Sequence, residues 1–556
     1  MLSRLYGLHL MMKRKLSAFL AEQSLATTTT TTTMSTARSV QLTQREQQLR
    51  LLLVNVAQFI DSTAKLSQPV VLRWAGGWVR DRLLGIESHD IDVAVNAMTG
   101  QQFAQHISEY CKRPEAVQTH GFLPGDIGRL HHIASNPDKS KHLETAMVKL
   151  FGMDLDFVNL RKETYAEDSR NPQMEFGTAE EDALRRDATI NALFYNLHTE
   201  EVEDFTGGIR DLEAKIIRTP LDPFQTFMDD PLRVLRLIRF ASRLGFTIDA
   251  ESEKFMSDES VLEALRKKIS RERVGVELEK MLKGKTPRVA LELLDRLGLY
   301  QAIFSDPLQE DVSMPDISRW HVAYTCLDEL LRNREPGSIG PVLVEDADST
   351  YLAWNLAAIS PWIPVEDRSG RKQKPNALPP VGVIAREGFK ASNKLTTVMA
   401  ACHRHRAEIL ALKQAVCESA PTIHERDTVG MAIRKWDAGG GHWKLQVLGV
   451  ILVDAMEQLE KFPAEDKKDR DEFLQGWDKF LKHLAELDVY DAPSLKRIID
   501  GRALAKALGV PPGTWMGKAL EICMAWQLRN PDEKDPEGAI QAVRDKAEEL
   551  GISPTK

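Results

Sequence analysis

The sequence is poor in cysteine, in long apolar runs and in excess positive charge. Its five cysteines are scattered over 556 residues and form no C-x-x-C pair, which argues against a disulfide framework or a zinc site and predicts a reducing compartment. The best apolar run, residues 447–453, is too short to cross a membrane. The net charge of −8 excludes a generally basic protein, so any contact with RNA must come from local basic patches.

One stretch, residues 70–93, contains the pattern around which the rest of the chain is interpreted. Its sequence, VVLRWAGGWVRDRLLGIESHDIDV, predicts a strand, a turn at Gly76-Gly77, a short helix over residues 78–84 and a second strand near Ile91. Glycines between a strand and a helix let the backbone approach a ligand, because no Cβ intervenes. The free N–H groups at the start of the following helix suit a phosphate.

Asp90 and Asp92 lie two residues apart at the start of the second strand. Because a strand alternates its side chains, both carboxylates are expected on one face. Oxygen ligands of this kind suit Mg²⁺ bound to substrate phosphates. Either motif alone is typical of an ordinary turn or a solvated pair. Together they describe the nucleotide and metal corner of a nucleotidyltransferase, and the stretch resembles the DNA-polymerase-β type of that superfamily.

The remaining pattern predicts an α/β head followed by a long all-helical portion. Thr43 and Glu46 have the spacing of a capping box at the start of a helix. Residues 112–145 are rich in Gly, Pro, His and Lys and predict loops, whereas residues 143–161 predict a hairpin. From about residue 225 the pattern is helical to the end of the chain.

Four further motifs follow the first one. Residues 181–196 and 229–246 are rich in arginine, whose planar fork suits triphosphate oxygens. Residues 204–212 predict a Gly-Gly turn before a helix, and residues 269–282 an amphipathic helix. Each motif alone is also typical of an ordinary charged helix or turn. The candidate polar residues of the two arginine-rich motifs are Arg185, Arg186, Asp187, Asn191, Asp230, Arg233, Arg236 and Arg239.

These five motifs, in this order and spacing, make the chain similar to the class II tRNA nucleotidyltransferases, the eukaryotic and bacterial CCA-adding enzymes. It looks like a eukaryotic member, and the resemblance covers residues 45–290. The C-terminal part is similar only in being helical and in residues 501–521, GRALAKALGVPPGTWMGKALE, which resemble the family's tail. Asp229 stands where many relatives have Glu, a conservative departure that leaves the assignment intact.

The resemblance implies a fold and a division of the chain. The fold is a polymerase-β-like α/β head with a mixed sheet, followed by an all-α neck, body and tail. The implied segments are 1–41 for a targeting segment and a threonine-rich linker, 42–200 for the catalytic head, 201–290 for the neck with its nucleotide-selecting helix, 291–430 for the helical body and 431–556 for the tRNA-binding tail.

The resemblance also implies an activity, the template-independent addition of C, C and A to a tRNA 3′ end. CTP and ATP would be the nucleotide substrates and pyrophosphate the leaving group. Asp90 and Asp92 would hold Mg²⁺ for a two-metal transfer, with Asp156 as a third active-site carboxylate. The implied partner is a tRNA with a missing or incomplete CCA end, with no membrane partner, and the chain is expected to be a monomer. The implied nucleotide-binding residues are Gly76, Gly77, Arg80, Arg186, Asp187, Asn191, Asp230, Arg233, Arg236 and Arg239.

Two of these residues predict how the base is selected. A carboxylate only accepts hydrogen bonds and a guanidinium only donates them. Asp230 and Arg233, expected on one helix face at i and i+3, would therefore complement the amino group and ring nitrogen that cytosine and adenine share. Uracil and guanine reverse that pattern, because they present a carbonyl acceptor beside a ring N–H donor. Residues 112–145 stand where the family has a loop needed for the final A.

Several alternatives remain open from the sequence. A poly(A) polymerase, or an enzyme that adds only CC or only A, shares the head motifs. A non-catalytic RNA-binding protein on an inactive head is a second possibility, although binding alone needs no paired carboxylates. A small-molecule nucleotidyltransferase shares only the first motif.

The N-terminal segment predicts the compartment. It is basic, has no acidic residue before Glu22 and has leucines at helical spacing, which is typical of a mitochondrial transit peptide. A threonine run, residues 27–33, is followed directly by Met34, a possible second start. The full chain is therefore expected in mitochondria, and a form starting at Met34 in the cytoplasm and nucleus. The alternative is a tail with incidental charge.

Overall fold

The computed structural model describes residues 40–88, 90–122, 126–128, 131–133, 145–164, 173–306, 314–366, 377–460, 462 and 467–552. The predicted targeting segment and threonine run lie outside these residues. Contacts divide the chain into two units. The first comprises Met1–His132, Thr145–Val158 and Phe194–Glu203, and the second comprises Ile133–Glu144, Asn159–Leu193 and Asp204–Lys556.

The first unit is built on a seven-stranded sheet with the strand order β3-β4-β5-β2-β1-β8-β9. β1 runs antiparallel to β2 and to β8, and β4 and β5 form the predicted antiparallel hairpin. Strands β3, β5, β8 and β9 each extend by one residue across the boundary between the units. The strands are β1 (Leu72–Ala75), β2 (Asp90–Val95), β3 (His131–Ile133), β4 (Thr145–Leu150), β5 (Met153–Asn159), β8 (Leu193–Asn196) and β9 (Val202–Asp204).

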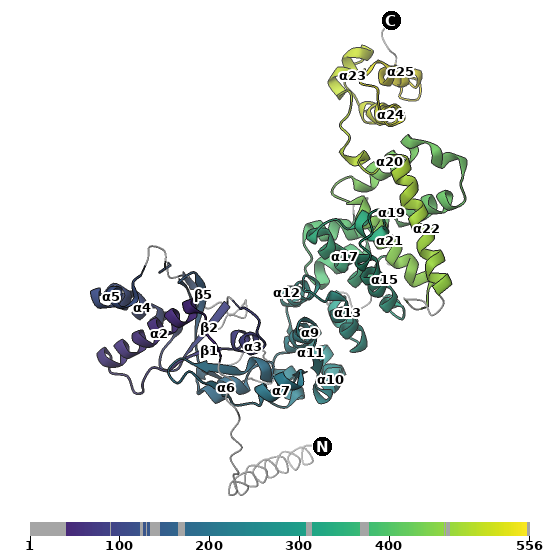
Figure 1. The fold of residues 1–556 in the computed structure, drawn as a ribbon. Helices are drawn as coiled ribbons and strands as arrows, with labels where there is room; N and C mark the ends of the chain where they lie inside the picture. Colours follow the sequence, from purple (N-terminus) through teal and green to yellow (C-terminus); the bar gives the residue numbers. More distant parts are fainter. Residues whose placement is uncertain are drawn as a thin grey trace, which may run out of the picture. The chain divides into compact units, whose positions relative to one another are not determined.

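Helices pack against this sheet because their apolar faces are buried on it (Figure 1). The helices on the sheet are α2 (Gln44–Thr63), α3 (Gly77–Leu83) and α4 (Gly100–Cys111), and α5 (Pro114–His120) contacts α4. The predicted capping box is confirmed: Thr43 and Glu46 bond reciprocally at the start of α2. At the start of α4, a Cβ on Gly100 would lie 2.1 Å from the Phe157 carbonyl oxygen, so only glycine allows this close approach of α4 to β5.

The loop prediction for residues 112–145 is wrong in part. Residues Pro114–His120 form α5, which has proline in its first turn and ends at Gly121 in the left-handed conformation. The burial of Ala116 shows that this short helix is packed rather than solvated on all sides. Within the same stretch, residues 123–125, 129–130 and 134–144 lie outside the described part of the chain.

The second unit begins with short strands and continues as helices. β6 and β7 form an antiparallel hairpin, and β10 and β11 pair in parallel. The prediction of a purely helical pattern after residue 225 is therefore wrong at Thr247–Ile248, which form β11. The elements are β6 (Arg161–Thr164), β7 (Gln173–Phe176), α6 (Ala179–Leu184), the 3-10 helix η2 (Thr189–Asn191), α7 (Gly208–Ala214), β10 (Ile216–Ile217), α8 (Pro223–Asp229), α9 (Leu232–Leu244), β11 (Thr247–Ile248), α10 (Ala250–Met256), α11 (Glu259–Lys268) and α12 (Arg271–Leu282).

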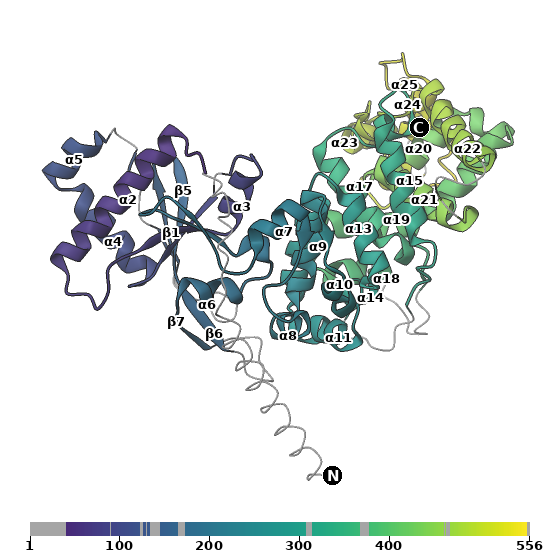
Figure 2. The ribbon, with the colours of Figure 1, turned by 60° about the horizontal axis from the view of Figure 1, so that its bottom comes forward.

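From residue 287 the described elements are all helical, as predicted (Figure 2). None of the described helices is both long enough and apolar enough to span a bilayer. They are α13 (Pro287–Arg296), α14 (Tyr300–Ile303), α15 (Trp320–Arg332), α16 (Ile339–Leu343), α17 (Ala347–Ile359), η3 (Ser360–Trp362), α18 (Pro380–Val383), the π-helix η4 (Ile384–Gly388), α19 (Asn393–Cys417), η5 (Pro421–His424), α20 (Arg426–Asp437), α21 (Trp443–Gln458), α22 (Lys467–Glu486), η6 (Ala492–Ser494), α23 (Gly501–Leu508), α24 (Met516–Arg529) and α25 (Glu537–Asp545).

The last three helices, α23 to α25, share a small apolar core of their own. Leu504 and Leu508 of α23 pack there with Trp515 and with Cys523 of α24. Residues 501–521, which resemble the family's tail, thus form α23 and the start of α24, with Gly509 in the left-handed conformation after α23. The α/β head followed by an all-α portion is confirmed, and the family-implied segment boundaries at 200, 290 and 430 stay predictions.

Candidate active site

The glycine turn and the D-x-D motif come together at one corner of the sheet in the first unit. Gly76 follows β1 directly and has φ 69° and ψ −124°, a conformation that residues with a Cβ rarely adopt. Ala75, the last residue of β1, pairs with Asp92 of β2. The backbone turn and the paired carboxylates are therefore neighbours across one antiparallel pair.

Asp90 and Asp92 share an exposed face of β2, as the sequence predicts. Both are exposed, whereas Ile91 and Val93 between and after them are buried in the core. The alternation arises because successive side chains of a strand point to opposite faces. The corner thus presents two carboxylates to solvent next to the glycine turn.

Asp156, the predicted third carboxylate, lies on β5, the sheet neighbour of β2. It is half-buried and alternates with Leu155 and Phe157, which are buried. The Phe157 ring packs on Phe103 of α4 with ring centroids 5.4 Å apart, so Asp156 lies on the sheet face opposite α4. Its strand and face are compatible with the predicted role, which stays a prediction.

Arg80, predicted to meet the triphosphate, is buried on α3 and its guanidinium donates to the neighbouring carboxylate, Asp81. The Arg80 Nε–Asp81 Oδ1 distance is 2.7 Å. Gly77 lies beside this guanidinium: a Cβ added to it would be 3.6 Å from Arg80 Nη2. The structure therefore places Arg80 directly under the glycine turn, held by a carboxylate that the sequence interpretation missed.

Glu46 is a second residue that sequence reasoning recognised only as a helix cap. Its side chain is buried and accepts hydrogen bonds from the Thr43 backbone N–H (2.7 Å), the Trp78 indole N–H (3.3 Å) and the Arg82 guanidinium. One carboxylate thus joins the start of α2 to α3, the helix that follows the glycine turn. A buried carboxylate with this many donors holds α3 in place, because removing it would leave the donors unsatisfied.

The first arginine-rich motif forms a buried network in the second unit. Asp182 of α6 accepts from Arg185 Nε at 2.9 Å and from Arg186 Nη2 at 3.0 Å. Arg186 also donates to the Asn191 carbonyl oxygen at 3.0 Å. Burial alone would raise the pKa of the Asp182 carboxyl, but the two guanidinium groups lower it below its ordinary value. Asp182 therefore remains charged and fixes the orientation of both arginines.

The network continues to α9 through Asp187. The Asp187 carboxylate accepts from Arg236 Nε at 2.6 Å and from the Asn191 amide at 3.1 Å. Although burial raises the pKa of this carboxyl, the Arg236 charge and the Asn191 bond outweigh it and lower the pKa to about 2. Arg236 and Asp187, predicted from separate motifs, are thus brought into direct contact.

Glu277 of α12 extends the chain of charges to Arg239. Its Oε2 accepts from Arg239 Nε at 2.6 Å, and its Oε1 lies 3.9 Å from Arg236 Nη1. Burial lowers the pKa of Arg239 despite this carboxylate. The sequence pointed to this helix as a motif but did not single out Glu277. Its buried position on an amphipathic helix that faces two arginines is known only once α9 and α12 are packed.

Asp230 and Arg233 do not share a helix face as predicted. α9 begins at Leu232, and Asp230 precedes it in an extended conformation with φ −137°. The proline between them ends the previous helix and starts the next one. Asp230 Oδ2 accepts from Arg273 Nη2 at 2.9 Å, and Arg233 Nη2 donates to the Arg185 carbonyl oxygen at 2.6 Å.

Comparisons with known proteins agree with this arrangement. A family model described as "Poly A polymerase head domain" matches residues 72–218, and one described as "Probable RNA and SrmB- binding site of polymerase A" matches residues 245–311. The "Nucleotidyltransferase lcsQ" of Purpureocillium lilacinum is 60% identical, and the match covers 99% of this chain and 99% of that protein.

A second relative is the "CCA tRNA nucleotidyltransferase, mitochondrial" of Saccharomyces cerevisiae. It is 38% identical, and the match covers 95% of this chain and 98% of that protein. The solved structure of a CCA-adding enzyme, apo form II, is similar in fold with a TM-score of 0.59 at 20% identity, covering 91% of this chain and 96% of that one. The chain therefore belongs to the family of CCA tRNA nucleotidyltransferases.

Proposed function

We propose that this chain adds C, C and A, without a template, to the 3′ end of tRNA from CTP and ATP and releases pyrophosphate. The observation that carries the proposal is the pair of exposed carboxylates, Asp90 and Asp92, next to the Gly76-Gly77 turn. Relatives named as CCA tRNA nucleotidyltransferases that match nearly the whole chain support the choice of tRNA as substrate.

The carboxylate pair fits Mg²⁺ that is shared with substrate. Mg²⁺ prefers hard oxygen ligands and is commonly held by one or two carboxylates together with substrate phosphates and water. Among the described residues, no three His, Cys, Asp or Glu side chains gather into a complete metal site. Asp90 and Asp92 would therefore hold the metal with the nucleotide's phosphates. When bound, Mg²⁺ supplies charge neutralisation for the leaving pyrophosphate and favours deprotonation of the attacking hydroxyl.

In the transfer, the tRNA 3′ hydroxyl oxygen forms a bond to the α-phosphorus of the nucleotide. The bond between this phosphorus and the oxygen that bridges it to the β-phosphate breaks, which releases pyrophosphate. The chain's own residues bind and orient the reactants. In the first unit, the backbone at Gly76 allows the triphosphate to approach closely, and Arg80 contributes guanidinium donors to it. Asp81 holds Arg80 in position. In the second unit, Arg186 is assigned to nucleotide binding and is held in position by Asp182.

We assign base selection to Asp230 and Arg233. Cytosine and adenine each present an amino donor beside a ring-nitrogen acceptor, which a carboxylate and a guanidinium complement. Arg233 has five N–H donors, and its bonds to carbonyl oxygens of Thr226 and Arg185 use two of them within the described residues. A guanidinium held at two points is pre-oriented for a base. The bond from Arg273 likewise holds the Asp230 carboxylate in one orientation.

A tRNA that lacks CCA, incubated with CTP and ATP and then sequenced at its 3′ end, tests the proposal. The expected product ends in CCA and is not extended further. Long A tails would instead indicate a poly(A) polymerase, the activity named in the matching head-domain model. Addition of only CC or only A would indicate a partial enzyme. Tight tRNA binding without any addition would indicate an RNA-binding protein on an inactive head.

The site of action is proposed to be the mitochondrion, with a cytoplasmic and nuclear form that starts at Met34. The basic leader supports the first part, as do relatives named as mitochondrial enzymes. Fluorescent fusions of the full chain and of the form starting at Met34 distinguish the two. The full chain should accumulate in mitochondria and the shorter form outside them, and identical distributions would contradict the assignment.

A further inference from the structure

A cavity of about 550 Å³ lies in the second unit between α9, α12 and the loop at residues 283–286. Five cationic side chains line it, together with the single carboxylate of Glu279. We refer to it as the basic cavity. The cations are Arg239, Arg243, Lys280, Lys283 and Lys285. On a chain with a net charge of −8, such a local excess of positive charge calls for an anionic ligand.

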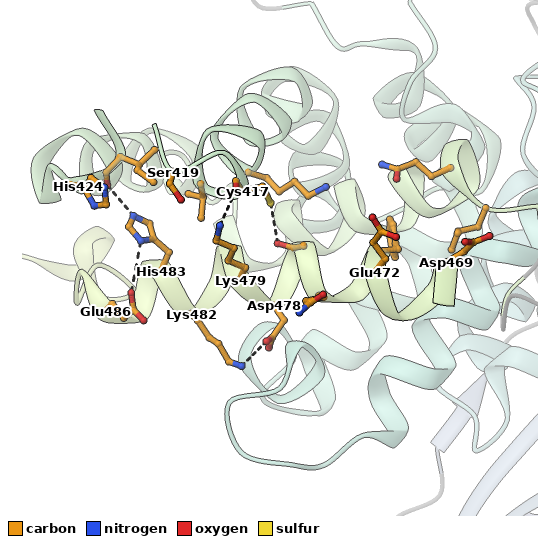
Figure 3. A pocket seen from close by; sticks show the side chains of 18 residues that line it. Cys417, Ser419, His424, Asp469, Glu472, Asp478, Lys479, Lys482, His483 and Glu486 are labelled. Atoms are coloured by element: carbon orange, nitrogen blue, oxygen red, sulfur yellow. Dashed lines mark hydrogen bonds and ion pairs between the residues drawn. The ribbon is translucent and has the colours of Figure 1, made fainter. Parts of the chain in front are cut away.

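A larger cavity in the same unit differs in its charge balance. It has about 840 Å³ and lies along α22 (Figure 3). Four carboxylates and three lysines line it. The Lys482 Nζ–Asp478 Oδ2 distance is 2.6 Å. The Lys479 ammonium donates to the Cys417 carbonyl oxygen at 2.8 Å. Carboxylates outnumber lysines in this larger cavity. The basic cavity also contains an ion pair, Lys283 Nζ with Glu279 Oε1 at 2.6 Å, but its five cations outnumber its one carboxylate. The basic cavity is therefore the better candidate for a polyanion.

The basic cavity adjoins the candidate nucleotide residues through Glu277. This buried carboxylate bonds Arg239, which lines the cavity, and lies near Arg236, which binds Asp187. Lys280 Nζ also lies 3.5 Å from Glu277 Oε1. An RNA whose 3′ end meets the nucleotide residues would therefore pass the cavity with its preceding backbone.

The type of cation indicates backbone phosphate rather than triphosphate. Lys280, Lys283 and Lys285 are exposed, and lysine is a flexible point charge that suits phosphates of variable position. The arginines of the candidate nucleotide site are instead fixed by buried carboxylates or carbonyl oxygens. Val276, 46% exposed, adds an apolar surface beside the charges on which a ribose can pack.

We propose that the basic cavity binds two backbone phosphates of the RNA substrate, upstream of the nucleotide that is being added. The inference rests on the proposed function, since it requires an RNA with its 3′ end at the nucleotide residues. Lys283 and Lys285 are the test positions, because both are exposed and neither contacts Glu277 among the ion pairs of the described residues. Lys283 Nζ pairs with Glu279 Oε1 at 2.6 Å on the surface.

The test measures binding of a tRNA that lacks CCA by the Lys283→Ala/Lys285→Ala double variant at several KCl concentrations. Affinity should fall about tenfold at low salt. The slope of log K against log salt should decrease in magnitude by about 1.5, because binding without these two phosphate contacts releases fewer counterions. In steady state the KM for tRNA should rise, while kcat and the KM for CTP stay unchanged. The Lys283→Arg/Lys285→Arg variant should restore binding.

The matched control is the Lys254→Ala/Lys267→Ala variant, which removes two exposed lysines of α10 and α11 outside the cavity. It should bind tRNA like the parent chain, and an equal loss in both double variants would overturn the proposal in favour of a general charge effect. Unchanged tRNA affinity with a raised KM for CTP would assign the cavity to the triphosphate and also overturn it. If the parent chain binds tRNA but adds no nucleotide, the proposed function fails while the binding comparison still decides the cavity's role.

Discussion

Replacing Asp187 by asparagine removes one charge from the centre of the second unit's network with little change of shape. The carboxylate is buried and joins Arg236 to Asn191. An asparagine side chain keeps one oxygen for the Asn191 amide but turns an amide donor toward Arg236. The Arg236 guanidinium would then be left with Glu277, 3.9 Å away.

The lowered pKa sets the size of the effect. The pKa of the Asp187 carboxyl falls from its ordinary value of 3.8 to about 2 in the folded chain. At about 1.4 kcal/mol for each pKa unit, this shift stabilises the folded chain by about 2 kcal/mol near neutral pH. Because the folded-state pKa is the lower one, this contribution is complete above the ordinary value and is lost as the pH falls through the folded value. At about pH 3, about half of it remains.

Hydrogen–deuterium exchange of peptides that cover residues 182–196 and α9 measures this loss where it occurs. Amides whose opening breaks the network should exchange about 30-fold faster in Asp187→Asn near neutral pH. The difference from the parent chain should shrink to about half in free energy at about pH 3. Glu180→Gln, which removes an exposed charge from α6, is the control and should exchange like the parent.

Two results would refute this reasoning. Equal exchange of the Asp187→Asn variant and the parent near neutral pH would mean that the Arg236 contact contributes nothing to local stability. A difference of the same size at about pH 3 as at neutral pH would mean that it arises from packing and not from the ionised carboxylate.

Three further outcomes are expected. Asp90→Ala and Asp92→Ala should each abolish nucleotide addition while the melting temperature changes little, because both side chains are exposed; near-native turnover would contradict the metal assignment. Arg233→Ala and Asp230→Ala should narrow the preference for CTP and ATP over UTP and GTP in kcat/KM, and unchanged discrimination would place base recognition elsewhere. A short Gly-Ser linker in place of the tip of residues 112–145 should preserve CC addition and abolish A addition, whereas equal loss of both would argue against a specific role.

Local patterns in the sequence were sufficient for much of the fold. The Gly76-Gly77 turn between β1 and α3, the exposed D-x-D pair and the capping box at Thr43 all follow from interactions within a few residues. The helical part after the head follows in the same way from its periodicity. Such features depend on backbone conformation and on alternation or helical spacing, which neighbouring residues determine by themselves.

Only the tertiary structure decided which charges meet. Glu46 bonds Arg82, Asp187 bonds Arg236 and Glu277 bonds Arg239, and each pair is separated by more than thirty residues in the sequence. It also placed Asp230 before α9 rather than on it. These contacts depend on how buried helices pack, because a charge leaves water only where the packing supplies a partner of opposite sign. Sequence spacing alone carries no record of that partner.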